Sequence, residues 1–542
     1  MLSNIFLNKR DKSNCHLVLG SLVVSFFFVI FLCSFLEPRW ESNDDVGMSM
    51  VAHGYGIAAF GSPHLIFSNV IWGYLVRCLP EFNGILGYSI ATIAVLISCG
   101  AVLVYGLLSF GLGYVSAFLV PFLALARPVL FPQFTINAGL LMVSFVICLH
   151  LYKQKNDKRI VFIGCLLAYC SYLVRNQEFF LVLAVSLPLL PFSSIRSDKW
   201  LKISLATTAL IVIASHAVDK NSYRGEEWAA FNKLNPPRAL FTDFGAHNYI
   251  KQRPDILERY GYSVNDINLT SNWFFADPNI TDPDKLNAML KELGPLPAQQ
   301  GAVERAFVGM KILLHPSLLP ILLAAGMIAF FCRSWQVAAS WSLCIAAIFV
   351  LGLLGRPGVV RVYVPLVSLL LIAPFLIENS QRWIQKNWYR QFVIHAILVA
   401  AAIFNTSIVF SASKTSQKEI KQISKELTGF PSYPVINWGA AFPFENAYPV
   451  LLRNTDAALS YQLYGLGAFT LAPFSVSSLE QKSGRGVVDL LKSKKEISII
   501  ASMNSLNLLD IYCKERLHCQ LTNIATQQYG TIQIHKYRCE DI

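Results

Sequence analysis

Long apolar segments separated by short polar connections make up most of the first 410 residues of this chain. The first apolar segment covers residues 17–36, and a run of about 20 apolar residues is long enough to cross a bilayer. The same criterion predicts eleven spans in all. They cover residues 17–36, 84–108, 112–130, 134–151, 160–176, 179–193, 203–219, 308–331, 336–354, 359–377 and 391–410. The pattern therefore predicts an α-helical polytopic membrane protein.

Beyond residue 410 the pattern changes to short runs in which apolar and polar residues alternate, as in KKEISIIASMNSL and TIQIHKYRC. Such alternation is typical of strands, and a segment of roughly 130 residues is long enough to hold its own core. We therefore expect two domains. A transmembrane domain covers residues 1–410 and includes two large outer loops, 37–83 and 220–307. A small extracytoplasmic α/β domain, called the tail domain below, covers residues 411–542.

Lysine and arginine predict the orientation of the spans. With eleven spans, the basic residues of the N-terminal segment and of four short connections all fall on one side. They are Lys9, Arg10, Lys12, Lys153, Lys155, Lys158, Arg159, Arg196, Lys199, Lys202, Arg333, Arg382, Lys386 and Arg390. Because such residues stay on the cytoplasmic side, we expect a cytoplasmic N-terminus and a tail domain on the outer face of the membrane, which in a bacterium is the periplasmic face of the inner membrane. Topology thereby accounts for the net charge of +12, and no nucleic-acid motif accompanies that charge.

An acidic pair, Asp44 and Asp45, follows the first span at the membrane–water boundary. The span lacks an A-x-A-like cleavage site, so we expect it to be retained. One carboxylate there can act as a general base on a substrate that is half lipid, and repulsion between neighbouring carboxylates raises one pKa. The alternative is that the pair caps a helix starting near Val46. His53 lies eight residues after Asp45, on roughly the same helical face, and can orient the substrate or assist proton transfer.

Several arginines lie near the outer ends of spans, where the positive-inside bias disfavours them. Four of them are our candidates for binding a lipid phosphate: Arg39, Arg175, Arg356 and Arg361. The planar guanidinium binds phosphate oxygens in pairs and keeps its charge. The alternative is that each arginine extends to lipid headgroups or pairs with an acid such as Glu178.

The outer loop 220–307 is rich in Trp, Tyr, Phe, Asn and Asp. Sugars stack on aromatic rings and hydrogen-bond to amides and carboxylates, although an ordinary interfacial aromatic belt has a similar composition. Our candidates for binding a sugar or acceptor are Trp228, Asp266, Trp273 and Asp277.

Three of the 12 cysteines, Cys513, Cys519 and Cys539, lie in the polar tail domain. If this domain is extracytoplasmic, two of them can form a disulfide. The sequence leaves the pairing open. No cysteine spacing is typical of a zinc site.

The layout resembles the GT-C superfamily of integral membrane glycosyltransferases. The resemblance rests on the acidic motif ESNDDVGMSM, the amphipathic segment HLIFSNVIWGYLVRCL and the outer C-terminal domain. It implies a sugar donor carried on a polyprenyl phosphate, and an envelope glycan or glycolipid, such as lipopolysaccharide, as acceptor. Asp44 or Asp45 would deprotonate the acceptor hydroxyl, which attacks the anomeric carbon, usually with inversion. Arg175, Arg356 and Arg361 would stabilise the leaving phosphate. Some members need a divalent metal, Mg or Mn, which here would bind Asp44 and Asp45.

Two other functions remain open from the sequence. An O-antigen-type polymerase or ligase also has many spans and functional arginines, but does not rely on an acidic pair after the first span. A transporter or flippase for lipid-linked sugars typically has repeated halves and charges at the bilayer midplane. The chain shows neither feature, so a membrane glycosyltransferase is the favoured reading.

Overall fold

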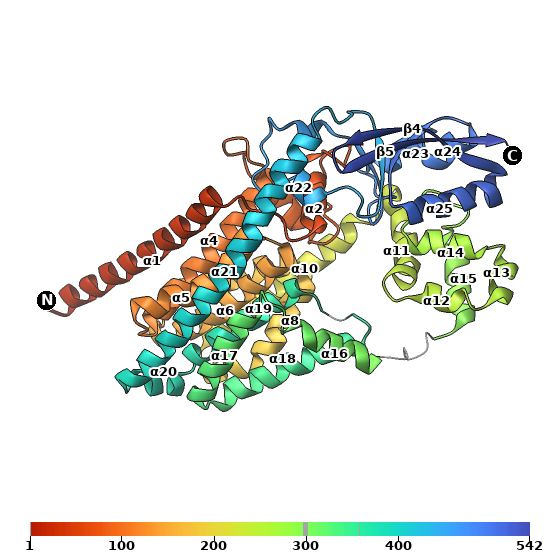
Figure 1. Cartoon of the computed structure of the whole chain (residues 1–542). Helices are drawn as coiled ribbons and strands as arrows, with labels where there is room; N and C mark the ends of the chain where they lie inside the picture. The colour runs from red at the N-terminus through yellow and green to blue at the C-terminus, as the bar shows by residue number, and fades with distance from the viewer. Residues whose placement is uncertain (1, 296–301, 357, 542) are drawn as a thin grey trace.

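The computed structural model of this protein describes residues 2–295, 302–356 and 358–541. A bundle of helices forms one end of the molecule, and the C-terminal sheet lies at the other end, beside the helices of the second outer loop (Figure 1). This arrangement confirms the predicted helical membrane protein with a small α/β domain.

Among the described residues, six helices are long and apolar enough to cross a membrane. They are α1 (Leu2–Phe35, apolar from His16), α4 (Gly87–Ser109), α6 (Phe134–Lys155), α10 (Lys199–Ser222), α18 (Trp335–Leu353) and α21 (Trp388–Glu426). Shorter helices complete the bundle: α5 (Tyr114–Leu130), α7 (Lys158–Val174), α8 (Asn176–Ser186) with η1 (Leu187–Leu189), α17 (Leu319–Cys332) and α19 (Val360–Leu376). The most apolar window of α6 is entirely buried, whereas that of α10 is only 11% buried. Helix α6 is therefore central, and α10 presents its apolar side chains outward, as a lipid-facing helix does.

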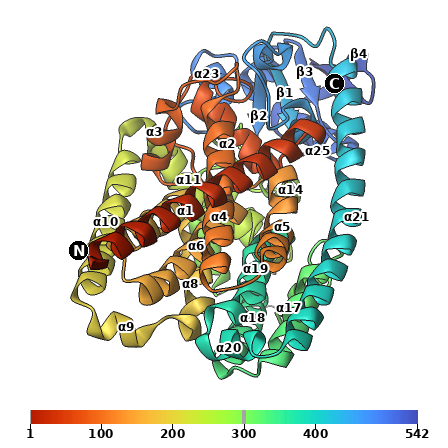
Figure 2. The same cartoon turned by 90° about the vertical axis from the view of Figure 1, so that its left-hand side faces the viewer.

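Two predicted spans differ from the structure. The span expected at 308–331 is divided into α16 (Ala302–Ile312) and α17. Pro316 lies between them, and a proline disfavours helical backbone in the residue before it. The span expected at 391–410 continues to Glu426, so α21 runs unbroken across the boundary that we placed at residue 410. Figure 2 shows α21 along the side of the bundle, rising to the tail domain.

The tail domain contains a five-stranded sheet in the order β2-β1-β3-β5-β4. Strands β1 (Val435–Trp438), β2 (Leu463–Leu466) and β3 (Ile497–Ile500) are parallel, and β4 (Cys519–Tyr529) and β5 (Ile532–Asp541) form an antiparallel hairpin on β3. Helices α23 (Val476–Lys482), α24 (Val487–Lys492) and α25 (Met503–Tyr512) connect them. The parallel strands are short and almost fully buried, as is usual for strands covered on both faces.

The second outer loop folds into helices that pack against the tail domain. They are α11 (Ala229–Thr242), α12 (Ala246–Ile250), α13 (Pro254–Tyr260), α14 (Val264–Ser271) and α15 (Pro283–Leu293). The ring of Phe274 lies 5.2 Å from that of Trp438 and 5.7 Å from that of Tyr512. The indole N–H of Trp438 donates to the carbonyl of Asn272 at 2.6 Å. Loop and tail domain thus share one hydrophobic core.

The first outer loop is also joined to the tail domain. It contains α2 (Asn43–His53) and α3 (Val70–Cys78). Three backbone hydrogen bonds connect its residues 56–59 to the tail: Leu463 N–H to Gly56, Val476 N–H to Ile57, and Ala59 N–H to Phe474, each 2.9 Å. These bonds hold α2 against the tail domain. The remaining short elements are α9 (Phe192–Ser197), η2 (Glu226–Trp228), α20 (Glu378–Gln385), α22 (Phe444–Ala447), η3 (Ala457–Ser460) and η4 (Cys513–Leu517).

Candidate active site

Asp44 lies in the first turn of α2 and faces a cavity of about 370 Å³. Its Oδ2 lies 3.0 Å from Nη1 of Arg361, the second residue of α19. Both side chains are partly exposed, at 26% and 29%. A carboxylate is favoured in the first turn of a helix by the exposed backbone N–H groups there. Asp44 is thus a partly exposed carboxyl group beside a guanidinium.

Asp45 is directed away from the cavity and is fully buried. Its Oδ1 accepts hydrogen bonds from the Tyr88 hydroxyl at 3.0 Å and from the Phe134 N–H at 2.9 Å. Burial, followed by the negative charge of Asp44, raises the pKa of Asp45 well above its ordinary value. Phe134 is the first residue of α6. The carboxyl group therefore caps α6, a different helix from the one that the sequence indicated.

Arg175 connects α7 to α8 and joins the Asp44–Arg361 pair. Its guanidinium lies 4.7 Å from the centre of the Phe134 ring. Its strongest charge interaction is with Glu178, the acid named above as an alternative partner, followed by Arg361, Asp44 and Asp45. Two of the four candidate arginines, Arg175 and Arg361, thus lie near the acidic pair. Asp45 also binds the backbone N–H of Phe134, whose ring contacts the Arg175 guanidinium.

The other two candidate arginines bind different carboxylates. Arg39 Nη1 lies 3.4 Å from Oε2 of Glu419 on α21 and 3.3 Å from Oδ1 of Asn446 on α22. Arg356 Nη2 lies 3.0 Å from Oδ2 of Asp243, which follows α11. These ion pairs connect outer loops to neighbouring elements.

His53, the last residue of α2, accepts a hydrogen bond at Nε2 from the Tyr88 N–H at 3.1 Å. Burial lowers the pKa of His53 to about 4. Tyr88 lies in the first turn of α4, so His53 satisfies one of the N–H groups that a helix start leaves without an intrahelical partner. The ring is neutral at physiological pH and does not belong to the cavity lining.

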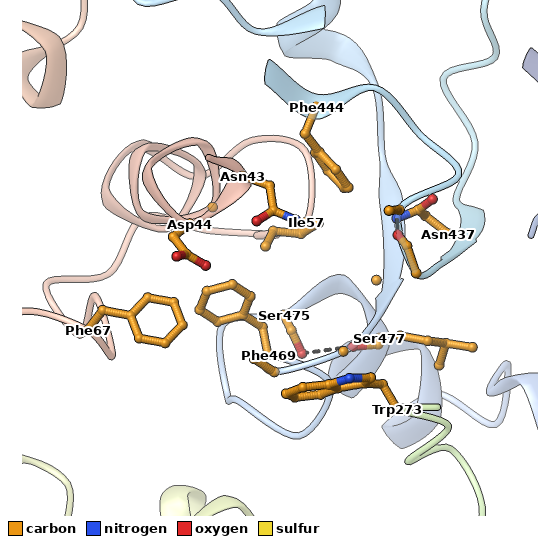
Figure 3. A pocket seen from close by; sticks show the side chains of 17 residues that line it. Asn43, Asp44, Ile57, Phe67, Trp273, Asn437, Phe444, Phe469, Ser475 and Ser477 are labelled. Atoms are coloured by element: carbon orange, nitrogen blue, oxygen red, sulfur yellow. Dashed lines mark hydrogen bonds between the residues drawn. The ribbon is translucent and has the colours of Figure 1, made fainter. Parts of the chain in front are cut away.

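The cavity lies between α2 and the tail domain, as Figure 3 shows, with Asn43 and Asp44 on one side and Asn437 on the other. It is lined by Asn43, Asp44, Gly47, Ile57, Phe67, Trp273, Asn437, Gly439, Ala440, Phe444, Gly465, Leu466, Gly467, Ala468, Phe469, Ser475 and Ser477. Its volume falls within the range of roughly 300–1,000 Å³ that small-molecule sites occupy. The lining combines apolar surface with a few amide and hydroxyl groups.

Of the four candidates in the second outer loop, Trp273 lines the cavity. Trp228 is buried against His64, Tyr223 and Phe474. Asp266 is fully buried, pairs with Arg516 of the tail domain and completes the capping box of α14. Asp277 accepts from the Tyr512 hydroxyl at 2.7 Å. The contacts of Trp228, Asp266 and Asp277 thus stabilise the packing of the second outer loop against neighbouring elements.

The residues around Asp44 offer few oxygen ligands to a divalent cation. One oxygen of Asp44 is paired with Arg361, Oδ1 of Asp45 already accepts two hydrogen bonds, and Oδ2 of Asp45 is unpartnered among the described residues but buried. Mg²⁺ and related cations need several free oxygen ligands, and the neighbouring guanidinium of Arg175 repels a cation.

The sequence did not identify the lining residues of the tail domain. Asn437 and Gly439 come at the end of β1, and Gly465 and Gly467 at the end of β2. The only local signal is glycine after a short apolar run, in VINWGA and QLYGLGA. That signal becomes informative once the two strands are known to be parallel neighbours.

No family model and no curated protein matches this chain. Among solved structures it is similar to two crystal structures of ArnT from Cupriavidus metallidurans. The apo structure is 13% identical, with 97% of this chain and 98% of ArnT covered and a TM-score of 0.37. The structure bound to undecaprenyl phosphate is 12% identical, with 96% and 97% covered and a TM-score of 0.35.

Proposed function

We propose that this protein is an integral membrane glycosyltransferase. It transfers a sugar from a polyprenyl-phosphate donor to an envelope glycan or glycolipid on the outer face of the bacterial inner membrane. The observation that carries the proposal is the Asp44–Arg361 pair, with a partly exposed carboxylate in a cavity and a guanidinium beside it. A base and a phosphate ligand are the two groups that this reaction requires from the protein.

In the proposed reaction the acceptor hydroxyl oxygen attacks the anomeric carbon of the donor. The bond from that carbon to the phosphate oxygen breaks, the hydroxyl proton passes to Asp44, and polyprenyl phosphate leaves. Attack from the face opposite the leaving group inverts the anomeric centre. Arg361 and Arg175 stabilise the charge that develops on the phosphate, because fixed cations act without reorganising.

Asp45 acts as a positioning residue in this scheme. It holds the backbone N–H of Phe134, and the Phe134 ring supports the Arg175 guanidinium. By binding Phe134, the buried Asp45 carboxyl keeps Arg175, one of the two proposed phosphate ligands, in place. A general base must be accessible to its substrate, which favours Asp44 over Asp45 for proton transfer.

The test is mass spectrometry of envelope glycans from a deletion strain that is complemented with wild type or with single variants. We expect Asp44→Asn to reduce the affected sugar decoration at least about 100-fold, and Arg361→Gln by about 100-fold. Arg485→Gln, which alters an exposed arginine of the tail domain, is the matched control, and blots confirm equal protein levels. If Asp44→Asn restored the glycan fully, Asp44 would not be the catalytic base, and a polymerase or a transporter would be favoured.

A further inference from the structure

The wall of the cavity opposite Asp44 is formed at one edge of the tail-domain sheet. Residues at the ends of β1 and β2 line it, including Asn437, Gly439 and Gly467. The two strands are parallel neighbours, with Asn437 beside Gly465. In sheets of this kind ligands bind outside the carboxyl ends of the parallel strands. The cavity therefore occupies the part of the tail domain that is best suited to bind a ligand.

Asn437 lines this cavity and has an unused hydrogen-bond acceptor. The side chain is buried, with 3% of its surface exposed. Its Nδ2 donates to the Gly439 carbonyl at 3.3 Å, but its Oδ1 has no partner among the described residues. Buried polar atoms without a partner are rare in native proteins. This oxygen is available for a hydroxyl group of a ligand.

Trp273 supplies a flat apolar surface to the same cavity. Its φ of +66° lies in the left-handed region, which is unfavourable for a bulky side chain and is tolerated where the surroundings enforce it. The Arg238 guanidinium lies 4.8 Å from the ring centre and covers one face of the indole. The cavity-lining surface of the ring can pack against the C–H groups of a sugar.

The cavity lining carries little charge. Among the described lining residues, Asp44 is the one ionisable side chain, and the others are apolar, amide, hydroxyl or glycine residues. The cationic groups near Asp44 are Arg361 and Arg175, and neither lines the cavity. A phosphate is therefore favoured on the arginine side of Asp44 and an uncharged ligand on the cavity side.

We propose that the cavity is the acceptor subsite and binds an uncharged, hydroxyl-rich sugar ring. The ring stacks on Trp273, donates a hydrogen bond to Asn437 Oδ1 and directs another hydroxyl to Asp44. This inference rests on the proposed function for the role of Asp44. In an inverting reaction the attacking oxygen and the leaving phosphate lie on opposite sides of the anomeric carbon. If the phosphate lies beside the arginines, the sugar ring in the cavity lies on the other side and belongs to the acceptor.

The first test measures binding without catalysis. Saturation-transfer NMR on the full chain in detergent micelles uses N-acetylglucosamine, galactose and mannose, and the 6-phosphate of each sugar, as probes. We expect at least one neutral sugar to bind, and binding to weaken about tenfold in Asn437→Ala and Trp273→Leu. Asp44→Asn should retain binding, and so should Asn437→Asp, which keeps an acceptor oxygen and checks that the site still folds.

Asn523→Ala and Trp388→Leu are the matched controls, because both residues lie outside the cavity. The subsite is overturned if no neutral sugar gives a signal, if the phosphorylated sugars bind more tightly, or if Asn437→Ala and Trp273→Leu bind as wild type does.

The second test separates acceptor from donor. Membrane vesicles from cells grown on [14C]glucose carry labelled lipid-linked sugars, whose transfer to glycan and hydrolysis by water are both measured. Asn437→Ala should reduce transfer of the labelled sugar to glycan about tenfold and leave hydrolysis of the donor unchanged. An equal loss of transfer and hydrolysis would show that the cavity binds the sugar of the donor. If Asp44→Asn transfers normally while neutral sugars still bind, the proposed function fails and the binding site stands.

Discussion

Asp44 and Asp45 are neighbours in sequence, yet their carboxyl groups have opposite surroundings. Successive residues of a helix are rotated by about 100°, so the two side chains leave α2 in different directions. Asp44 reaches the cavity and Arg361, whereas Asp45 reaches Tyr88 and Phe134 in the bundle. Asp44 is therefore accessible from the cavity, as the proposed base must be, whereas Asp45 is enclosed by its hydrogen-bond partners.

The buried carboxyl of Asp45 predicts an unusual response to substitution. Because its pKa is raised, the neutral form stabilises the fold fully below the ordinary pKa, and this contribution is lost as the pH rises through the folded-state pKa. Asp45→Asn stays neutral and keeps the Oδ1 acceptor. We expect its melting temperature in detergent to equal or exceed that of wild type at pH 8, with a smaller difference at pH 5.

Asp45→Ala is the control for this prediction, since it leaves the Tyr88 hydroxyl and the Phe134 N–H without their acceptor, at a cost of about 1–3 kcal/mol. A melting temperature of Asp45→Asn as low as that of Asp45→Ala at pH 8 would show that the charge itself is needed.

His53 predicts a loss of stability in acid. Its pKa is about 4 in the folded protein, below the ordinary 6.5, so its contribution to stability is complete above pH 6.5. It is lost as the pH falls through 4, by up to about 3 kcal/mol. His53→Gln keeps a side-chain acceptor but does not titrate. Thermal unfolding between pH 7 and pH 4 should therefore change less in this variant, and parallel curves for the two proteins would contradict the assignment.

Among the elements, η4, β4 and β5 bring the three tail-domain cysteines together. Cys513, Cys519 and Cys539 are buried, and their sulfur atoms all lie within 4.8 Å of one another. The Sγ atoms of Cys513 and Cys539 are 3.3 Å apart. The structure thus favours one pairing where the sequence left three.

We predict a Cys513–Cys539 disulfide in protein isolated from an oxidising compartment. Peptide mapping without reduction, after free thiols are blocked, should find this bond and a blocked Cys519. Cys539→Ala should destabilise the tail domain by about 2–4 kcal/mol, and Cys519→Ala by less. Three blocked thiols in the native protein, or a bond to Cys519, would refute the pairing.

For the whole molecule, the sequence was informative wherever the signal is local. Apolar length predicted helices such as α4, α6 and α19, and alternation predicted β3 and β5 of the tail domain. The role of Asp45 was not predictable, because its partners lie 43 and 89 residues away. The same holds for the core around Trp438, which joins the tail domain to Asn272. The position of Asn437 in the cavity was not predictable, because the sequence around it does not indicate that β1 and β2 are neighbouring strands.

Helix α21 makes the bilayer part of the geometry of the cavity. Its 39 residues form a continuous rod of about 58 Å, at 1.5 Å per residue, and roughly 20 of them fill the hydrocarbon core. Its far end is tied to the sheet, since Glu426 accepts a hydrogen bond from the Thr531 N–H at 2.9 Å. A tilt of about 5° over such a length displaces the far end by about 5 Å. Because the tilt of a membrane helix responds to lipid thickness as well as to its packing, a thinner or thicker bilayer would shift the tail domain, which forms one wall of the cavity.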